Sequence, residues 1–449
     1  MGARGVSGDG SVNAAGRSTR LTAGERKSHM SERDLFLSEH EKLTRRFFLR
    51  AGAACVAGTG GLSLVAAAAP PAPELAKTLD KLEPFFTSQE DFQDVSRGKP
   101  VPHSLPEEKK REVGLTRDTW KLEVVSDPDN PATLGKQLTR ADGTALDFAG
   151  LMRLAEKHAV RFAKVMTCLN IGCPLGMGVW EGVPLREAIW LTRPQENLRR
   201  VFYYGYHNDD PAQMFRSSLP VGRVFEDLYD LPPVILCYKL NGNWLTAKRG
   251  GPVRIVVPEA YGFKSVKWLT HVVLTNLYHA NDTYAEGNND IDSPLKTFAA
   301  TLSTPGEVKK EEAIPVTGYA QVGVSGLSKV QVWIHPAGQE WPIEDRYFTK
   351  GPWIDAEVLP PPRRWGAGLK DEAILKDTMG FDATTGKPRD WPMRLGKVHW
   401  AALLPGLPAG EYLLRCRTLD ANGIAQPMPR PFHKSGHSAI EAVKLTVKA

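Results

Sequence analysis

The chain has 449 residues, of which 42% are hydrophobic and 24% are charged, and its formal net charge is +6. This length predicts two or three domains of about 150 residues each, and the balance is that of a globular protein. The modest charge and the lack of a dense Lys/Arg block argue against nucleic acid as a partner. The five cysteines form no CxxC, CxxCH or zinc-type pair of pairs, which excludes a disulfide scaffold, a zinc module and a covalently attached haem.

An export signal is predicted at the N-terminus. Arg45 and Arg46, followed by Phe-Phe-Leu, are typical of a twin-arginine signal, and an Ala- and Gly-rich apolar run follows over 51–70. A transmembrane anchor is the alternative, but the run is weakly apolar and ends in prolines. We therefore expect a disordered N-terminus and signal peptide over 1–69, cleavage near residue 69, and a periplasmic protein that is exported folded with a redox cofactor.

The mature chain shows two successive patterns. Strands are expected at 120–125 and 253–257, and amphipathic helices at 148–159 and 184–191, which together indicate a mixed α/β region.

A charged segment bounded by Pro and Gly, 303–315, then resembles a linker. Beyond it, short alternating strands are expected at 329–334, 411–417 and 443–447, separated by Pro and Gly turns. This second pattern is typical of a β-sandwich.

Four stretches of the α/β region carry motifs. In chain order they are TCLNIGCPLGMGVWEGVPL (167–185), YYGYHNDDPAQMFRSSLPV (203–221), YKLNGNWLTAKRGGPVRIVVPEAYGFKSVKWLT (238–270) and NDTYAEGNNDIDSP (281–294). The first resembles a Cys-x-x-Asn segment leading to W-x-G-V-P-L, and the third combines N-G-x-x-L with G-x-x-x-V-K-W-L. Together these motifs resemble those of the sulfite oxidase family of molybdopterin enzymes.

The resemblance covers roughly residues 80–449 and implies both a fold and a function. The fold would be α+β, with a molybdopterin-binding catalytic domain over 70–305 followed by an all-β, immunoglobulin-like sandwich over 306–449. The function would be oxygen-atom transfer on a small anionic or oxo substrate, by sulfite-like oxidation or S-oxide reduction. Electrons would be exchanged with a separate cytochrome or membrane carrier, and the sandwich is similar to one used for homodimerisation.

The molybdenum ion and its pterin dithiolene need a soft anionic protein ligand and close cationic contacts. Cys168 matches the metal's thiolate ligand, with Cys173 as its rival, and Tyr284 matches a catalytic tyrosine that hydrogen-bonds at the metal's oxo or hydroxo group. Cys237 and Cys416 are expected in hydrophobic cores. The cofactor-binding residues implied by the resemblance are Asn170, His207, Arg249, Arg254, Ser265, Val266 and Lys267.

Two departures from the family pattern bear on the substrate. Arg249 stands where the family motif has His, and the segment after Cys168 is shorter than in vertebrate and plant sulfite oxidases. The arginines of their sulfite pocket have no clear match in that segment, so Arg216 and Arg394 are the candidate anion contacts. We expect sulfite itself to be a poor substrate.

Two other functions remain open. One is a secreted binding protein in which the sandwich binds the ligand and the cofactor domain is degenerate. The other is a cysteine hydrolase that uses Cys168 with His158 or His271 as its base. Neither alternative predicts bound molybdenum.

Overall fold

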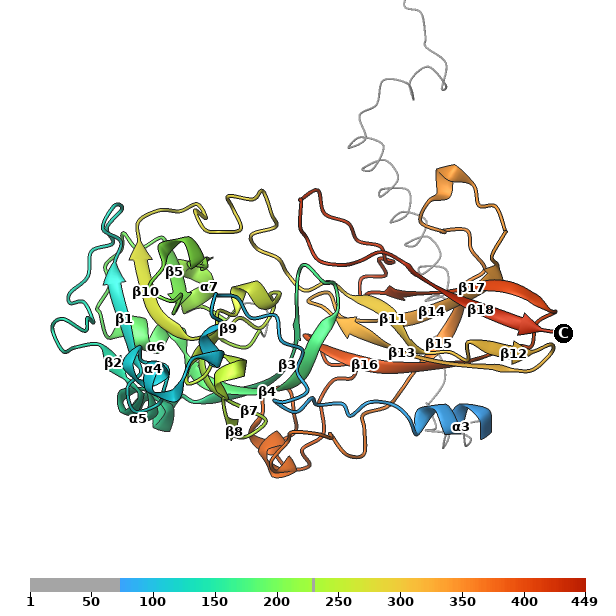
Figure 1. The fold of residues 1–449 in the computed structure, drawn as a ribbon, viewed down its shortest axis with the longest axis horizontal. Helices are drawn as coiled ribbons and strands as arrows, with labels where there is room; N and C mark the ends of the chain where they lie inside the picture. Colours follow the sequence, from blue (N-terminus) through green and yellow to red (C-terminus); the bar gives the residue numbers. More distant parts are fainter. Residues whose placement is uncertain (1–72, 228–230) are drawn as a thin grey trace, which may run out of the picture. The chain divides into compact units, whose positions relative to one another are not determined.

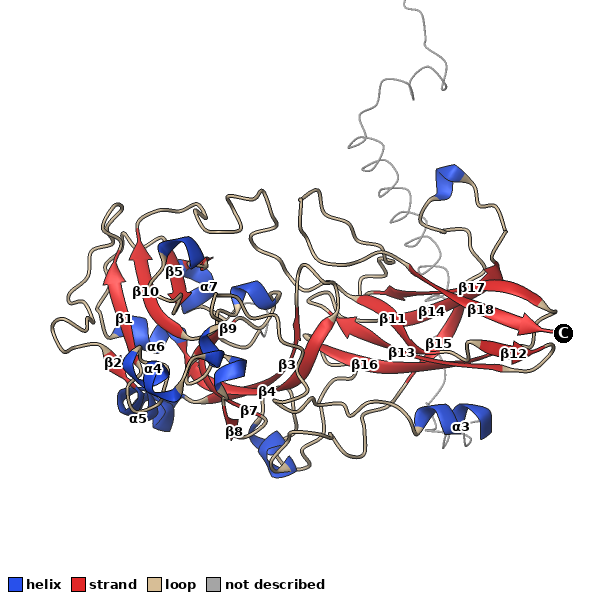
Figure 2. Ribbon diagram, viewed as in Figure 1, coloured by secondary structure: helices blue, strands red, loops and turns tan. Residues whose placement is uncertain are grey.

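The computed structural model describes residues 73–227 and 231–449, so the predicted export signal and its cleavage site lie outside the described residues. Strands make up most of the regular structure, and the helices are short (Figure 2). The strands form three sheets, two with five strands and one with eight. No helix in the described ranges is long and apolar enough to cross a membrane.

The first sheet mixes parallel and antiparallel strands. Its order is β2 (Leu146–Asp147), β1 (Lys121–Ser126), β10 (Leu269–Thr275), β5 (Arg200–Gly205) and β6 (Arg216–Pro220). β1 and β10 are parallel, and the other neighbours are antiparallel. α5 (Phe148–His158) begins immediately after β2. The Asp147 side chain accepts a hydrogen bond from the N–H of Gly150 and so caps the start of the helix. The predicted strand at 120–125 and helix at 148–159 are confirmed.

The second sheet carries the strand that leads to Cys168. Its order is β3 (Val160–Thr167), β4 (Pro174–Pro184), β7 (Ile235–Leu240) and β8 (Asn243–Trp244), and β9 (Arg254–Val256) pairs with β7. All of these pairings are antiparallel. α6 (Leu185–Trp190) follows β4, so the predicted helix at 184–191 and the predicted strand at 253–257 are confirmed.

One hydrophobic core joins these two sheets. Side chains from both sheets are fully buried in it, among them Leu122, Val201, Leu236, Ile255 and Val272. A large-to-small change at such a position typically costs about 2–5 kcal/mol. The core therefore supports both sheets, while the buried side chains of β3 belong to two neighbouring clusters.

The third sheet is all antiparallel except at one edge. Its order is β11 (Phe298–Ser303), β13 (Ile314–Val322), β16 (Gly396–Leu404), β15 (Ile354–Val358), β14 (Lys329–Pro336), β17 (Gly410–Leu419), β18 (Glu441–Lys448) and β12 (Glu307–Lys309). β12 pairs parallel with β18. β11 also packs against β17 and β18, so the sheet curls around its own core (Figure 1).

This curled sheet confirms the predicted all-β C-terminal part, including its three predicted strands. Cys416 is fully buried in its core, and burial raises the pKa of the thiol to about 12. The sandwich is built from one continuous sheet, and the segment predicted as a linker, 303–315, contains β12. The domain boundary at 305–306 stays a prediction.

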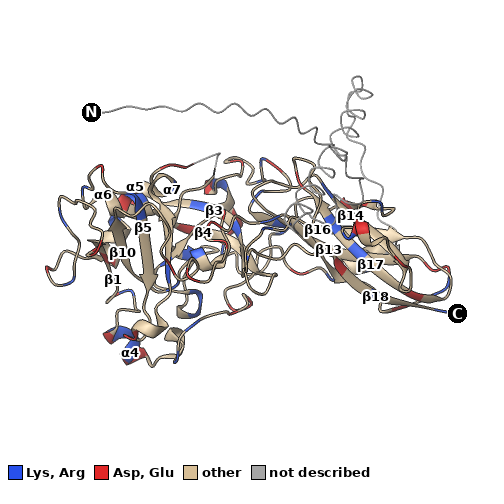
Figure 3. Cartoon of the chain, turned by 90° about the horizontal axis from the view of Figure 1, so that it is seen from above, with Lys and Arg blue, Asp and Glu red and all other residues tan. Residues whose placement is uncertain are grey.

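Short helices fill the connections. They are α3 (Pro73–Leu79), η1 (Pro102–Ser104), α4 (Glu107–Glu112), η2 (Pro211–Gln213), α7 (Val221–Phe225), η4 (Ala247–Arg249), η5 (Gly262–Lys264), η6 (Ile343–Asp345) and η7 (Glu372–Asp377). α3 packs on β13 and β16, although about 240 residues separate it from β13 (Figure 1). Along the described residues, Lys and Arg positions are interspersed with Asp and Glu positions (Figure 3).

Candidate active site

Cys168 lies where the chain leaves the second sheet. β3 ends at Thr167, and the loop over 168–173 turns back so that the N–H of Gly172 donates to the carbonyl of Cys168 at 3.3 Å. Gly172 has a φ of 65°, and a Cβ there would lie 2.5 Å from the Cβ of His437. Only glycine fits this left-handed, crowded position, and the turn leaves Cys168 half-buried at the strand end.

Tyr284 faces the same place from the 281–294 loop. Burial raises the pKa of its phenol, and a negative charge at Cys168 adds to the rise. The positive charge of Arg97 and a hydrogen bond with Asn170 oppose it. Cys168 and Asn170 thus lie close enough to Tyr284 to act on its phenol.

Aromatic rings hold the Tyr284 side chain. Its ring stacks on Phe263 with the centroids 3.8 Å apart and the planes at 3°, and Phe215 packs edge-on at 5.7 Å. The guanidinium of Arg97 lies 4.8 Å from the centre of the Phe215 ring. Arg97 therefore places one exposed cation beside the phenol.

A second cluster, the cationic cradle, consists of Arg249, Arg254 and Lys267. Arg249 is 3% exposed, yet its Nε and Nη2 have no hydrogen-bond partner among the described residues. Arg254 is 4% exposed and donates to the carbonyls of Arg249 and Ser265, while its Nε is also unpartnered. Buried donors without acceptors are rare in proteins, so these guanidinium groups indicate an anionic ligand.

Lys267 is the third cation of the cradle. Its Nζ donates to Asp94 Oδ1 at 3.1 Å, Ser96 Oγ at 2.7 Å and the carbonyl of Lys248 at 2.9 Å. Burial is the main cause that lowers the pKa of Lys267 to about 7, and the charge of Arg254 adds to it. Burial alone would raise the pKa of Asp94, but hydrogen bonds from Ser96 and the charge of Lys267 outweigh burial and bring it to about 2.

Backbone donors complete the cradle. The N–H groups of Val266 and Lys267 donate to no acceptor in the described part of the chain. Gly250 has a φ of 94°, and a Cβ there would lie 2.7 Å from the Cβ of Lys267, so a glycine is needed for this close approach. Two adjacent free N–H groups beside three cations form a good site for a phosphate.

Gln93 connects the cradle to the Cys168 loop. Its backbone carbonyl lies 3.4 Å from Arg249 Nη1, and its side-chain Oε1 lies 3.7 Å from the sulfur of Cys173. The two clusters are therefore parts of one site.

The long connection between β17 and β18 reaches the same site from the C-terminal part. Arg430 Nη1 donates to Asp290 Oδ2 at 2.6 Å, and the N–H of Asp290 donates to the carbonyl of Lys434 at 2.9 Å. His437 packs against Gly172, as described above. Residues 430–437 thus hold both the Tyr284 loop and the Cys168 loop.

Much of the site lies in a part of the chain that resembles known proteins. The family model described as "Oxidoreductase molybdopterin binding domain" matches residues 111–282. "Sulfite oxidase, mitochondrial" of Drosophila melanogaster is 28% identical over 314 residues, which cover 64% of this chain and 50% of that protein. Residues 111–282 therefore form a molybdopterin-binding oxidoreductase domain, and the chain is similar to sulfite oxidases.

The chain is also similar to a plant nitrate reductase and to one solved structure. "Nitrate reductase [NADH] 2" of Arabidopsis thaliana is 26% identical over 379 residues, covering 69% of this chain and 40% of that protein. The chain spans about half the length of the curated sulfite oxidase it matches, or less for the nitrate reductase. The sulfane dehydrogenase SoxCD of Paracoccus pantotrophus shares the fold, with a TM-score of 0.50 at 15% identity over 88% of this chain and 96% of that one. The predicted fold class is confirmed.

The residues present fit a molybdenum–pterin cofactor. The unpartnered guanidinium groups and backbone N–H groups of the cradle suit its phosphate, and Cys168 offers the thiolate. Among the described residues, no group of three or more His, Cys, Asp or Glu side chains could hold a metal ion by itself. A metal bound at Cys168 would therefore need ligands from the cofactor, which a dithiolene supplies.

The side chains of two predicted cofactor-binding residues contact other residues of the protein. Ser265 Oγ accepts from the N–H of Val257 at 3.1 Å, and the Val266 side chain packs in the hydrophobic core of the two sheets. Of Val266, only the backbone N–H remains for a ligand.

Sequence analysis missed three site residues, Asp94, Arg97 and His103. His103 stacks on Trp268, and its Nε2 lies 3.5 Å from Asp94. Its Nδ1 is buried without a partner in the described ranges, and burial, followed by the positive charges of the cradle, lowers its pKa against the pull of Asp94. All three lie in an irregular, Pro-rich stretch whose sequence shows no periodicity.

His207 lies outside the cradle's contacts. Its Nδ1 is 3.3 Å from the carbonyl of Gly205, and its ring packs edge-on against Tyr204.

The two candidate anion contacts have neighbours of their own. Arg216 donates to the carbonyl of Asn281 at 2.6 Å and covers the Phe202 ring. Arg394 lines a hollow on the curled-sheet part together with Trp391.

The other cysteines and the hydrolase alternative can also be placed. Burial raises the pKa of Cys173, with a further rise from Cys168, and burial raises that of Cys237 to about 12 in the core. His158 precedes β3 and Cys168 follows it, so they lie roughly 25 Å apart. His271 pairs with Glu123 at 3.0 Å on the first sheet. The structure therefore gives no support to a dyad of Cys168 with either histidine.

Proposed function

We propose that the chain is an exported molybdenum oxidoreductase that transfers an oxygen atom to or from a small anionic oxo compound. The observation that carries the proposal is the meeting of Cys168, Asn170 and Tyr284 beside a buried cationic cradle with unpartnered donors. The export signal predicted from Arg45 and Arg46 motivates the periplasmic location.

Bound molybdenum cofactor supplies the two-electron change and the exchangeable oxygen. With that cofactor bound, Cys168 would contribute a thiolate to the metal, and the cradle would hold the phosphate of the pterin. Because the pKa of the Tyr284 phenol is raised above its usual value, near ~10, the group stays protonated at neutral pH and donates a hydrogen bond toward the reacting oxygen.

Arg97 is the cation that binds the substrate. It is exposed and lies beside the phenol, so an anion can reach it from solvent and be directed toward Cys168. A single guanidinium contributes about 1.5–3 kcal/mol through a charge-assisted hydrogen bond, which gives weak selectivity between anions. We therefore expect weak binding of sulfite and better turnover with another sulfur or nitrogen oxo compound.

Electrons are exchanged with a separate cytochrome or membrane carrier. The chain's 449 residues contain no CxxCH segment to attach a haem, which motivates this assignment. A homodimer through the curled sheet belongs to the same proposal.

Elemental analysis of the full-length, exported protein tests the proposal. We expect about one molybdenum per chain together with the pterin. Steady-state assays with artificial electron mediators then compare sulfite oxidation with S-oxide reduction. Protein that is exported and folded but free of molybdenum would refute the proposal and favour the binding-protein alternative.

A further inference from the structure

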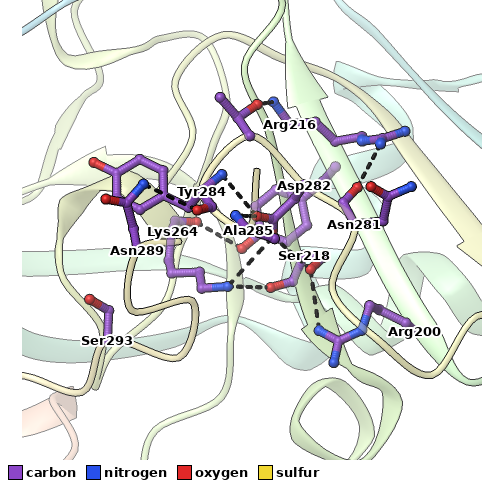
Figure 4. A network of polar contacts seen from close by, with 12 residues as sticks. Arg200, Arg216, Ser218, Lys264, Asn281, Asp282, Tyr284, Ala285, Asn289 and Ser293 are labelled. Carbon is purple, nitrogen blue, oxygen red and sulfur yellow. Dashed lines mark hydrogen bonds and ion pairs between the residues drawn. The ribbon is translucent and has the colours of Figure 1, made fainter. Parts of the chain in front are cut away.

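A buried carboxylate, Asp282, lies two residues before Tyr284 and is 0% exposed. Its Oδ1 accepts hydrogen bonds from the backbone N–H groups of Tyr284 and Ala285, both at 3.1 Å. Its Oδ2 accepts from Ser218 Oγ at 2.8 Å. Figure 4 shows Asp282 between the Tyr284 loop and Ser218 of β6. The carboxylate therefore attaches the start of the Tyr284 loop to the first sheet.

The partner charge of Asp282 is Lys264, which is 2% exposed and lies 4.0 Å away. Lys264 Nζ donates to the carbonyl of Ser218 at 2.7 Å, and its own carbonyl accepts from the hydroxyl of Tyr203 at 2.9 Å. The preceding residue, Phe263, is the one that stacks on Tyr284. Lys264 thus fixes the ring against which the phenol lies.

Asp282 and Lys264 both contact Ser218 of β6, and together they hold the backbone and the ring of Tyr284. Burying a carboxylate and an ammonium group is costly unless each is paired and hydrogen-bonded. Among the described residues, every side-chain hydrogen bond of Asp282 and Lys264 goes to Ser218 or to the loop that carries Tyr284. The arrangement reaches the backbone of Tyr284 through Asp282 and its ring through Phe263.

We propose that Asp282 and Lys264 are positioning residues that fix the phenol of Tyr284 relative to Cys168. The inference rests on the proposed function, because it assumes that the Tyr284 hydroxyl acts in turnover. Neither side chain touches the substrate, so each acts only through Tyr284.

A double-mutant cycle tests this dependence. Asp282→Ala should lower kcat about 10- to 100-fold, the range expected when a catalytic group is displaced by about 1 Å. In a Tyr284→Phe background, the same change should lower kcat by less than about 2-fold, because the group that it positions is already gone. Asp282→Asn keeps the oxygen that accepts from both N–H groups, so it should restore most of the lost kcat. An equal loss in both backgrounds would overturn the proposal.

Asp345 offers a matched control. It is also a buried carboxylate that accepts hydrogen bonds from two backbone N–H groups, those of Thr349 and Lys350, but it lies in η6 of the C-terminal part. Asp345→Ala should lower the unfolding temperature while changing kcat by less than about 3-fold. A loss of kcat as large as that of Asp282→Ala would show that the loss of any such buried carboxylate suffices.

Hydrogen–deuterium exchange gives a readout that does not depend on activity. In the purified full chain, Asp282→Ala should speed exchange in peptides that contain the Tyr284 and Ala285 amides. Molybdenum content is measured on the same samples. If exchange in the Asp282→Ala variant is unchanged while the protein holds molybdenum, the positioning role is refuted and the proposed function is not. If the wild-type chain holds no molybdenum, the proposed function is refuted, and the exchange result still stands.

Discussion

Cys168 and Cys173 occupy one six-residue loop, but they differ in their surroundings. Cys168 adjoins Tyr284, whereas Cys173 turns toward Gln93. We predict that Cys168→Ser lowers turnover by about 1000-fold or more, equivalent to roughly 4 kcal/mol of lost transition-state stabilisation, because the soft thiolate is lost. The pterin should remain bound, since the cradle is intact, and fluorescence of the released pterin measures this.

Cys173→Ser serves as the control, with turnover expected within a few-fold of wild type. If Cys168→Ser keeps full activity while Cys173→Ser loses it, the ligand assignment is reversed.

Arg97 carries a second prediction for a single residue. Arg97→Ala should raise KM for an anionic substrate about 10-fold and change kcat less, because one charge-assisted hydrogen bond of ~1.5 kcal/mol is removed. Lys99→Ala is the matched control, since it removes one exposed charge from the same segment. If both changes raise KM equally in steady-state assays, the total positive charge of the segment matters and Arg97 has no specific role.

The residues predicted from sequence and those missed differ in how the chain presents them. Cys168, Tyr284 and the cradle arginines lie in contiguous motifs, so their resemblance to a family could be seen directly. Asp94 meets Lys267 across 173 residues of sequence. Such a contact arises from the folding of an irregular stretch over the sheets and leaves no periodic signal.

At the scale of elements, the loop after β3 depends on a glycine. Gly172→Ala should unfold at a lower temperature and bind less pterin, because the new methyl group would collide with His437 in addition to the unfavourable φ. Gly143 has a φ of 69° and no neighbour within 4 Å of its Cβ position, so Gly143→Ala isolates the backbone term of about 1–2 kcal/mol. If the two variants have the same unfolding temperature and pterin content, contact with His437 does not explain the need for a glycine at residue 172.

Helices and strands were predicted correctly where one hydrophobic period dominated the segment. The prediction failed where a strand depends on pairing with a segment far away in the sequence. α5 and β1 follow clear local patterns and lie within one residue of their predicted bounds. β12 has three residues, and it exists because β18 lies beside it about 140 residues later in the chain. The curling of one sheet into a sandwich likewise depends on distant pairings that alternation alone does not specify.

At the scale of the whole molecule, buried lysines make stability depend on pH. Burial lowers the pKa of Lys164 and Lys267 to about 7 and that of Lys264 and Lys296 to about 8. In the unfolded chain these groups titrate near ~10.4, so the unfolded state binds more protons above pH 7. The free energy of unfolding of cofactor-free protein should therefore rise from pH 7 to about 8.5, above which unfolded cysteines begin to ionise and oppose the rise.

Urea unfolding at a series of pH values measures this rise. Lys164→Met should make it shallower, because Lys164 is fully buried and, among the described residues, its Nζ donates only to the carbonyls of Pro258 and Ala260. A free energy of unfolding that falls steadily from pH 7 to 8.5 would contradict the prediction.

The connection between β17 and β18 has a consequence for the order of events in the cell. Residues 430–437, which hold the Cys168 and Tyr284 loops, are translated after both of these loops and after β17. A ribosome-bound nascent chain therefore lacks these contacts until the connection between β17 and β18 has been made. We expect closure of the site around a cofactor to follow that point.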